Sequence, residues 1–205
     1  ARLDLDRRLS TLELQALRSR LNPHFIFNCL NSINRYILKE EKGKASYYLS
    51  QFAKLIRYTL DYTSEPDVSL SEEINVTRLY VELESLRMAE PIQLDIHYDP
   101  GIEPDNIRVP PLFIQPYVEN SIWHGLAPKK ENLCLHVRVS KLPGGHTFEI
   151  EDNGVGRAAA ARGQHKGHHI SKGMTLAKES FDYYGLTCNM QTQVDLIDLY
   201  DDRGS

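Results

Sequence analysis

The chain has 205 residues, of which 41% are hydrophobic and 25% are charged, and its formal net charge is −4. This apolar content allows a buried core, and the length suits one globular domain with an appended helical segment. The mildly negative charge argues against a general nucleic-acid-binding or anionic-membrane surface, so we expect neither partner. The three cysteines follow no CxxC spacing, which favours a reducing compartment and argues against a disulfide framework or a zinc site.

No apolar run reaches about 18 residues and no signal peptide is visible, so we expect no transmembrane span and no direct membrane contact in these residues. A charged segment with helical spacing begins at once, over residues 3–22, as expected for the middle of a longer protein. Its leucines fit a short coiled coil or an amphipathic helix that packs on its own domain, and the pattern supports both equally.

The first half of the chain is predicted to form a helical hairpin. The first helix continues, bent at Pro23, through about Leu38; Gly43 marks a turn, and a second helix covers about 45–62. One hairpin has too little core to be stable alone, so we expect a homodimer through residues 3–62 that completes a four-helix bundle. The expected dimer face comprises Tyr48, Phe52, Ile56 and Leu60 together with the stripe Phe25–Ile33.

Strands and helices alternate in the remaining residues. After a loop around Pro66, Ser69 with Glu72 fits a capping box that opens a helix over roughly 71–88. Further helices are expected at about 112–124 and 173–184, strands near 92–98, 133–139, 148–150 and 187–197, turns at 100–101 and 143–145, and a loop over 157–172. This mixed order predicts an α/β sandwich with helices on one face of a mixed sheet.

Residues 21–33, which read LNPHFIFNCLNSI, place His24 directly after Pro23 at the start of a helix or at a bend in one. A histidine held at such a defined point can act as a nucleophile, although this stretch alone supports a structural histidine equally well. Asn28 and Asn31 fall roughly on the same helix face. There they orient the imidazole or an incoming phosphate, or else they make hydrogen bonds between helices.

Two later stretches favour the nucleophile. Residues 110–126 read PPLFIQPYVENSIWHGL, and residues 151–156 read EDNGVG. With residues 21–33, they resemble LytS/YehU-type sensor histidine kinases, and most closely a Bacteroidetes-like branch of that family. The first stretch is similar to the phosphoacceptor segment, and the other two are similar to the N box and the G1 box of the GHKL-class ATP-binding domain.

The resemblance extends over about residues 10 to 195 and implies an α+β fold with two domains. Residues 1–68 correspond to a coiled-coil lead-in and a phosphoacceptor and dimerisation hairpin, which is a dimeric four-helix bundle. Residues 69–205 correspond to a GHKL, or Bergerat-type, ATP-binding α/β sandwich with a mixed sheet. The family usually has one more strand after residues 201–205, so the last strand is expected to be missing.

The resemblance also assigns roles in phosphoryl transfer. It implies that His24 accepts the γ-phosphoryl group of ATP and that Asn120 holds Mg²⁺, an ion that keeps several waters and takes few protein ligands. Glu119 is a candidate base for His24 or orders a Mg²⁺-bound water; the alternative is a surface carboxylate. His124 lies four residues after Asn120, on the same helix face, and resembles a basic position near the phosphates; the alternative is a structural histidine.

The glycine motifs complete the expected ATP site. Asp152 is expected to accept a hydrogen bond from the adenine amino group, while Gly154 and Gly156 let the backbone approach the nucleotide; a plain β-turn is the alternative for the glycines. The second glycine box departs from the usual GxGL, because residues 171–174 read SKGM. Lys172 and Gly173 are nevertheless expected near a phosphate. The histidines at 165, 168 and 169 favour a lid over the nucleotide rather than a metal site.

The sequence therefore predicts the cytoplasmic kinase core of a two-component sensor that is anchored in the inner membrane. ATP and Mg²⁺ support autophosphorylation of His24, and the phosphoryl group then passes to an aspartate of a response regulator of the LytTR type. The alternative is a degenerate module that binds nucleotide, or only dimerises, without kinase activity. The variant second glycine box and the short C-terminal end favour this alternative, whereas the intact His24 and Asn120 motifs favour the kinase.

Overall fold

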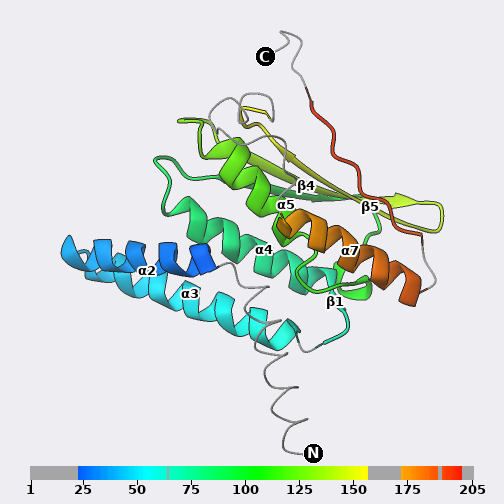
Figure 1. Ribbon diagram of the computed structural model, residues 1–205, viewed down its shortest axis with the longest axis horizontal. Coiled ribbons are helices and arrows are strands. Elements are labelled where there is room, and N and C mark those ends of the chain that lie inside the picture. The colour runs from blue at the N-terminus through cyan, green and yellow to red at the C-terminus, as the bar shows by residue number, and fades with distance from the viewer. Residues whose placement is uncertain (1–22, 64, 157–171, 189–190, 200–205) are drawn as a thin grey trace, which may run out of the picture. The chain divides into compact units, whose positions relative to one another are not determined.

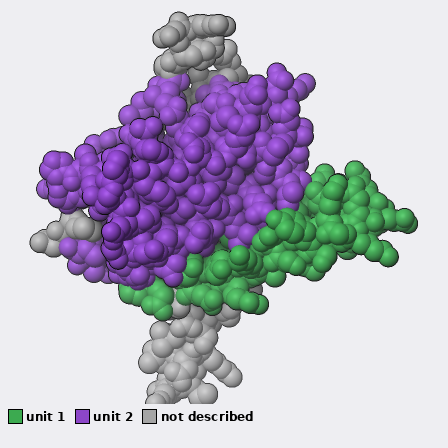
Figure 2. All heavy atoms as spheres, turned by 180° about the vertical axis from the view of Figure 1, so that it is seen from behind, with its two compact units in different colours: residues 1–66 green, residues 67–205 purple. Residues whose placement is uncertain are grey.

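The computed structural model describes residues 23–63, 65–156, 172–188 and 191–199. The helix expected over residues 3–22 therefore lies outside the described residues, as does nearly all of the loop expected over 157–172. The chain divides into two compact units, residues 1–66 and residues 67–205. Figure 1 shows the elements of each unit, and Figure 2 shows the two units in different colours.

The first unit contains the predicted helical hairpin. Helix α2 covers Pro23–Leu38 and helix α3 covers Lys42–Thr63. Glu40 turns the chain between them with a positive φ of 59°, the left-handed conformation that commonly follows a helix C-terminus. The predicted turn at Gly43 is wrong, because Gly43 already lies in the first turn of α3.

The two helices bury an apolar seam against each other. The Tyr48 hydroxyl donates to the Cys29 sulfur at 3.5 Å, and both side chains are fully buried. The rings of Phe25 and Phe52 lie 6.3 Å apart. The expected dimer face was therefore partly wrong, because Tyr48 and Phe52 pack against α2 of their own hairpin.

A second apolar stripe on each helix is exposed. Its large members are Phe27, Leu30 and Ile37 on α2, and Leu49 and Leu60 on α3. Spacings of three, seven and eleven residues place each set along one side of its helix. The hairpin thus has one apolar face buried between its helices and another that remains open.

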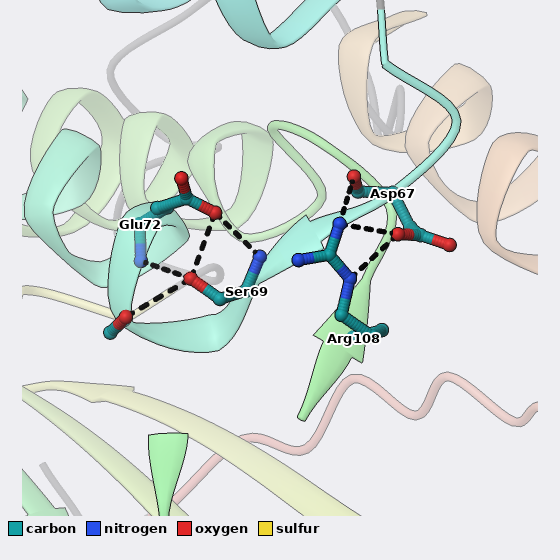
Figure 3. A network of polar contacts seen from close by, with 5 residues as sticks. Asp67, Ser69, Glu72 and Arg108 are labelled. Carbon is teal, nitrogen blue, oxygen red and sulfur yellow. Dashed lines mark hydrogen bonds and ion pairs between the residues drawn. The ribbon is translucent and has the colours of Figure 1, made fainter. Parts of the chain in front are cut away.

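The second unit opens with the predicted capping box, shown in Figure 3. The Glu72 N–H donates to the Ser69 hydroxyl oxygen at 3.2 Å, and the Ser69 N–H donates to the Glu72 carboxylate at 2.8 Å. These two bonds satisfy backbone donors at the start of a helix, where no intrahelical partner exists. Helix α4 accordingly covers Leu70–Ser85, close to the predicted range.

A short strand pair flanks this helix start (Figure 3). Strand β1, Val68–Ser69, pairs antiparallel with strand β3, Arg108–Val109, which follows the 3₁₀ turn Pro104–Asn106. The Arg108 guanidinium lies 2.6 Å from the Asp67 carboxylate and donates to the Asp67 carbonyl at 2.8 Å. The pair ties the start of α4 to the segment that leads into the predicted N box.

The main sheet is mixed, as the sequence predicted. Its strands are β2 (Gln93–Tyr98), β4 (Cys134–Leu142) and β5 (Gly145–Asp152), in the order β2-β4-β5. β2 and β4 are parallel, whereas β4 and β5 form an antiparallel hairpin through Gly144, which has a φ of 85°. On β4, Leu135, Val137 and Val139 are buried and alternate with exposed side chains, so one face of the sheet is covered.

Helices cover that face. Helix α5 (Gln115–Asn120) continues into a π-helical segment η2 (Ser121–Leu126), and helix α7 covers Lys172–Thr187. With α4, helices α5 and α7 run beside one another on one side of the sheet (Figure 1). Phe113 joins the layers, because its ring contacts Phe148 of β5 edge-on and stacks on Phe181 of α7.

Two predicted elements differ from the structure. The helix predicted at 112–124 begins only at Gln115 and changes to π-helical geometry from Ser121. The strand predicted near 187–197 is wrong, because α7 runs to Thr187 and residues 191–199 form no strand.

Candidate functional site

Glu73 of α4 holds the start of the segment that carries the predicted N box. Its buried carboxylate accepts the N–H groups of Leu112 and Ile114 at 2.7 and 3.0 Å. Leu112 has a φ of 61°, in the left-handed region that leucine rarely adopts. Burial raises the pKa of Glu73 to about 7, against the opposing effect of the two backbone hydrogen bonds. A carboxylate on another helix therefore fixes where α5 begins.

A second buried carboxylate, Glu84, lies near the C-terminal end of α4. One Arg87 nitrogen lies 2.8 Å from each of its oxygens. Burial raises the pKa of Glu84 to about 7, although the neighbouring Arg87 lowers it. The Arg87 guanidinium also lies over the Trp123 ring, 5.0 Å from its centroid, which links α4 to η2.

Glu119, the candidate base, faces this interface between α4 and α5. The Gln115 side-chain amide donates to the Glu119 carboxylate at 2.9 Å, one helical turn away. Burial raises the pKa of the Tyr80 hydroxyl, and the nearby charges of Glu119 and Glu84 raise it further. The Glu119 carboxylate is thus held by Gln115 and lies close enough to Tyr80 and Glu84 to affect their ionisation.

The end of η2 touches the predicted G1 box directly. An added Cβ on Gly125 would lie 2.3 Å from the Asp152 Oδ1 atom, and an added Cβ on Gly154 would lie 2.3 Å from the Gly125 carbonyl carbon. The Val155 N–H donates to the Gly125 carbonyl at 3.0 Å, and the Gly154 N–H donates to Asp152 Oδ1 at 2.9 Å. The N box and the G1 box therefore meet at a junction that only glycine allows.

Asn153 secures the same loop from the other side. Its side-chain oxygen accepts the Cys134 N–H at 2.9 Å, and its side-chain amide donates to the Asn132 carbonyl at 2.7 Å. The Lys129 ammonium donates to the Asn153 carbonyl at 2.9 Å. Asn153 thus joins the loop after β5 to the start of β4, while its neighbour Asp152 faces Gly125.

The other predicted ATP-site residues lie on the same unit. Asn120 is half-buried at the end of α5, and His124 is exposed on η2. Gly156 has a φ of 76°, which an L side chain rarely adopts. Lys172 and Gly173 open helix α7, and their side-chain surroundings lie outside the described part.

His24, the predicted phosphoacceptor, lies in the first unit near the start of α2. Its imidazole is exposed, and the Asn28 side-chain amide lies 3.2 and 3.3 Å from the two ring nitrogens. Asn31 is also exposed, one turn further along. Asn28 therefore lies beside the imidazole, as one of the two alternatives predicted. Which ring nitrogen accepts its N–H depends on the histidine tautomer.

Neither a clustered metal site nor a membrane span is found where the structure can be described. No group of three or more His, Cys, Asp or Glu side chains among the described residues is arranged to hold a metal ion. The predicted histidine tract at 165–169 lies outside those residues. No described helix is both long enough and apolar enough to cross a bilayer.

Sequence reasoning missed three residues that shape this site: Glu73, Gly125 and Asn153. The other buried positions of the helix that contains Glu73 are mostly apolar. A carboxylate on such a buried face needs hydrogen-bond donors, and this need is the signal that could have pointed to its backbone partners. Gly125 follows His124 near the end of a helix, where a glycine is common as a C-terminal cap and gives no sign of a tertiary contact. Asn153 occupies the variable position of the DxGxG pattern, so the motif itself did not mark it.

Comparison with known proteins agrees with these motifs. A family model described as "Histidine kinase" matches residues 12–92, which include His24. The sensor protein LytS of Oceanobacillus iheyensis is 32% identical over 148 residues, covering 72% of this chain and 25% of the relative. LytS of Streptococcus agalactiae serotype V is 32% identical over 149 residues, with coverages of 72% and 25%.

The sensor histidine kinase YpdA of Escherichia coli is 31% identical over 144 residues, covering 70% of this chain and 25% of the relative. The chain thus spans about a quarter of the length of the curated relatives it matches. The relatives are named as sensor proteins or as a sensor histidine kinase, and the segment that matches the family model contains the exposed His24. The chain therefore belongs to the family of LytS-type sensor histidine kinases.

Proposed function

We propose that this chain is a kinase core that transfers the γ-phosphoryl group of ATP to His24. The observation that carries the proposal is the exposed His24 imidazole, with Asn28 beside its ring nitrogens, inside the segment that matches the histidine kinase family. An exposed imidazole nitrogen can be reached by a phosphoryl group and can act as a nucleophile.

In the proposed reaction, one imidazole nitrogen of His24 forms a bond to the γ-phosphorus while the bond to the β,γ-bridging oxygen breaks. ADP leaves with the electron pair, and the product is a phosphoramidate after the second ring nitrogen loses its proton. Such a transfer depends mainly on positioning and charge neutralisation. Asn28 is proposed to orient the ring, and Glu119 remains the candidate base that receives the proton.

The ATP site is proposed to lie where the N box and the G1 box meet. Asp152 is proposed to accept a hydrogen bond from the adenine amino group. Gly154 and Gly156 allow the backbone to approach the nucleotide closely. His124, Lys172 and Gly173 are proposed to lie near the phosphates. The close approach of Gly154 to Gly125 supports a nucleotide site where these two segments meet. Mg²⁺ would neutralise phosphate charge, and the half-buried Asn120 amide fits an ion that keeps most of its waters.

Incubation with γ-labelled ATP tests the proposal. The purified chain is expected to take up label that is stable to alkali and labile to acid, as a phosphoramidate is. Nucleotide binding without incorporation would instead identify the degenerate binding module. Acid-stable, alkali-labile label would contradict a phosphohistidine product.

Asn120→Ala tests the metal ligand. Loss of this amide is expected to weaken Mg²⁺–ATP binding by roughly 10- to 150-fold, because a contact to a charged group is removed. ATP binding in the absence of Mg²⁺ should change little, so the variant loses most of its metal dependence in calorimetry. Asn75→Ala, an exposed asparagine on α4, is the matched control. Equal metal dependence in Asn120→Ala and wild type would reject the assignment.

We further propose that the hairpin dimerises through its exposed stripe, which keeps Phe27, Leu30 and Leu60 of the predicted face but not Tyr48 and Phe52. Phe27 is 66% exposed and Leu30 is 48% exposed, and an apolar stripe of this kind favours a four-helix bundle. Phe27→Asp removes two copies of the ring, each worth about 1.5–3 kcal/mol, so the dimer dissociation constant should rise by at least about 100-fold.

Light scattering over a concentration series measures this change. Leu142→Asp, at an exposed leucine in the second unit, should leave both the dimer and ATP binding intact. A wild-type chain that stays monomeric at about 100 µM, a concentration above the dissociation constants of most standard-size interfaces, would reject the bundle.

The partner that receives the phosphoryl group is proposed to be an aspartate of a response regulator, with LytTR-type regulators as the first candidates. The kinase core is proposed to act on the cytoplasmic side of an inner-membrane sensor. Both proposals rest on the resemblance of the motifs to LytS/YehU-type sensor histidine kinases, and the relatives' names as sensor proteins are consistent with them.

A further inference from the structure

We infer that Gly125 is a positioning residue for purine selection, because it fixes the Asp152 carboxylate in the orientation that prefers adenine to guanine. The inference rests on the proposed ATP site and adds a residue that neither the motifs nor the relatives assign.

The first observation is the closeness of η2 to the carboxylate. An added Cβ on Gly125 would lie 2.3 Å from Asp152 Oδ1, 2.9 Å from Cγ and 3.2 Å from Oδ2. Carbon–oxygen contacts normally lie at about 3.3–3.6 Å, so any side chain at position 125 would push the carboxylate away by about 1 Å. The absence of a side chain at 125 is therefore a condition for the present position of the Asp152 oxygens.

The second observation is that hydrogen bonds hold both the Asp152 carboxylate and the Gly125 carbonyl in place. Asp152 Oδ1 accepts the Gly154 N–H at 2.9 Å, while Gly154 itself abuts the Gly125 backbone. The Val155 N–H donates to the Gly125 carbonyl at 3.0 Å. The carboxylate cannot move away from position 125 without losing the Gly154 bond or shifting the loop.

The third step is chemical. Adenine presents an amino donor at C6, whereas guanine presents a carbonyl acceptor there. A carboxylate of fixed orientation accepts a hydrogen bond from the first and repels the second. A carboxylate displaced by about 1 Å loses a well-aligned bond and also repels guanine less. Gly125 thus acts on selectivity through Asp152, and it need not touch the nucleotide.

Gly125→Ala tests this through the ratio of two dissociation constants, measured by calorimetry with non-hydrolysable ATP and GTP analogues. The ATP-over-GTP preference should fall by roughly 10- to 150-fold, the range expected when a charge-assisted hydrogen bond is lost. Gly145→Ala is the matched control, because nothing lies within 4 Å of its added Cβ. A merely structural effect of Gly125→Ala would weaken both nucleotides alike, and an unchanged ratio would overturn the inference.

Two further variants keep the test decisive. Asp152→Asn should lower the preference by itself, and adding Gly125→Ala to it should change the ratio little further. If Gly125→Ala folds poorly, the double variant Gly125→Ala with Asp152→Ala removes the carboxylate oxygen that the added methyl group would contact. This double variant should regain the melting temperature that Gly125→Ala loses, but it should not regain the ATP-over-GTP preference. A melting temperature that stays as low as that of Gly125→Ala would overturn the inference. A wild-type chain with no preference for ATP would overturn the proposed site itself, and this inference with it.

Discussion

Replacement of His24 by glutamine is expected to abolish phosphate incorporation and to leave ATP binding unchanged. Glutamine has no ring nitrogen that can form a stable bond to phosphorus. His24 is exposed on α2, so its loss should not disturb the hairpin core. Label uptake from γ-labelled ATP should therefore fall to background, while calorimetry should give the wild-type dissociation constant for ATP.

A matched substitution separates the acceptor from a general effect of losing a histidine. His97 is exposed on β2 in the second unit, and His97→Gln should incorporate label at the wild-type rate. Label that persists in His24→Gln would move the acceptor to another residue. Loss of ATP binding together with incorporation would mean that His24 supports the fold of the nucleotide site.

The second large effect concerns the buried Glu73 and the pH dependence of stability. Its pKa is about 7 in the folded chain, against an ordinary value of 4.5. Between these values the folded chain keeps a proton that the unfolded chain has lost, so the unfolding free energy falls as pH rises from 4.5 to 7. Glu73 should contribute roughly 3 kcal/mol to this fall. Glu84 has a similar pKa and contributes in the same direction.

Glu73→Gln should remove the Glu73 share of the pH dependence. In urea unfolding, the loss of stability between pH 4.5 and pH 8 should shrink by roughly 3 kcal/mol relative to wild type. At pH 4.5, where the wild-type carboxyl is protonated, the variant should still be less stable by about 1–3 kcal/mol, because the glutamine NH₂ group replaces an oxygen that faces one of the Leu112 and Ile114 N–H groups. Glu131→Gln, at an exposed loop residue, is the control. A wild-type pH profile in Glu73→Gln would show that Glu73 does not titrate in this range.

Local signals in the sequence predicted local structure well. The capping box needs only Ser69 and Glu72, which are three residues apart, and α4 begins where the box predicts. The start of α5 could not be found in this way. It depends on Glu73, which is distant in the sequence and accepts the Leu112 and Ile114 N–H groups just before the helix begins.

Tertiary context decided the remaining differences. Tyr48 and Phe52 have the apolar spacing of a helix face, but spacing cannot tell whether a face packs on its own hairpin or on a second copy. Val194 and Leu196 are spaced as in a strand, yet residues 191–199 form no strand, because apolar spacing alone does not supply the backbone pairing that a strand needs. For the candidate site, the motifs located Asn120 and Asp152, whereas the glycine contact between their segments is visible only in three dimensions.

The π-helical turn η2 constrains how the length of this segment can change during evolution. Its i→i+5 bond, from the Ala127 N–H to the Ile122 carbonyl at 2.7 Å, accommodates one residue more than an α-helical turn would. Deleting one of these residues would return the turn to the α-helical repeat and remove the wide turn in which Gly125 lies. That wide turn would then no longer place the Gly125 carbonyl against the Val155 N–H. The number of residues between Asn120 and Gly125 should therefore stay constant among chains that keep this nucleotide site.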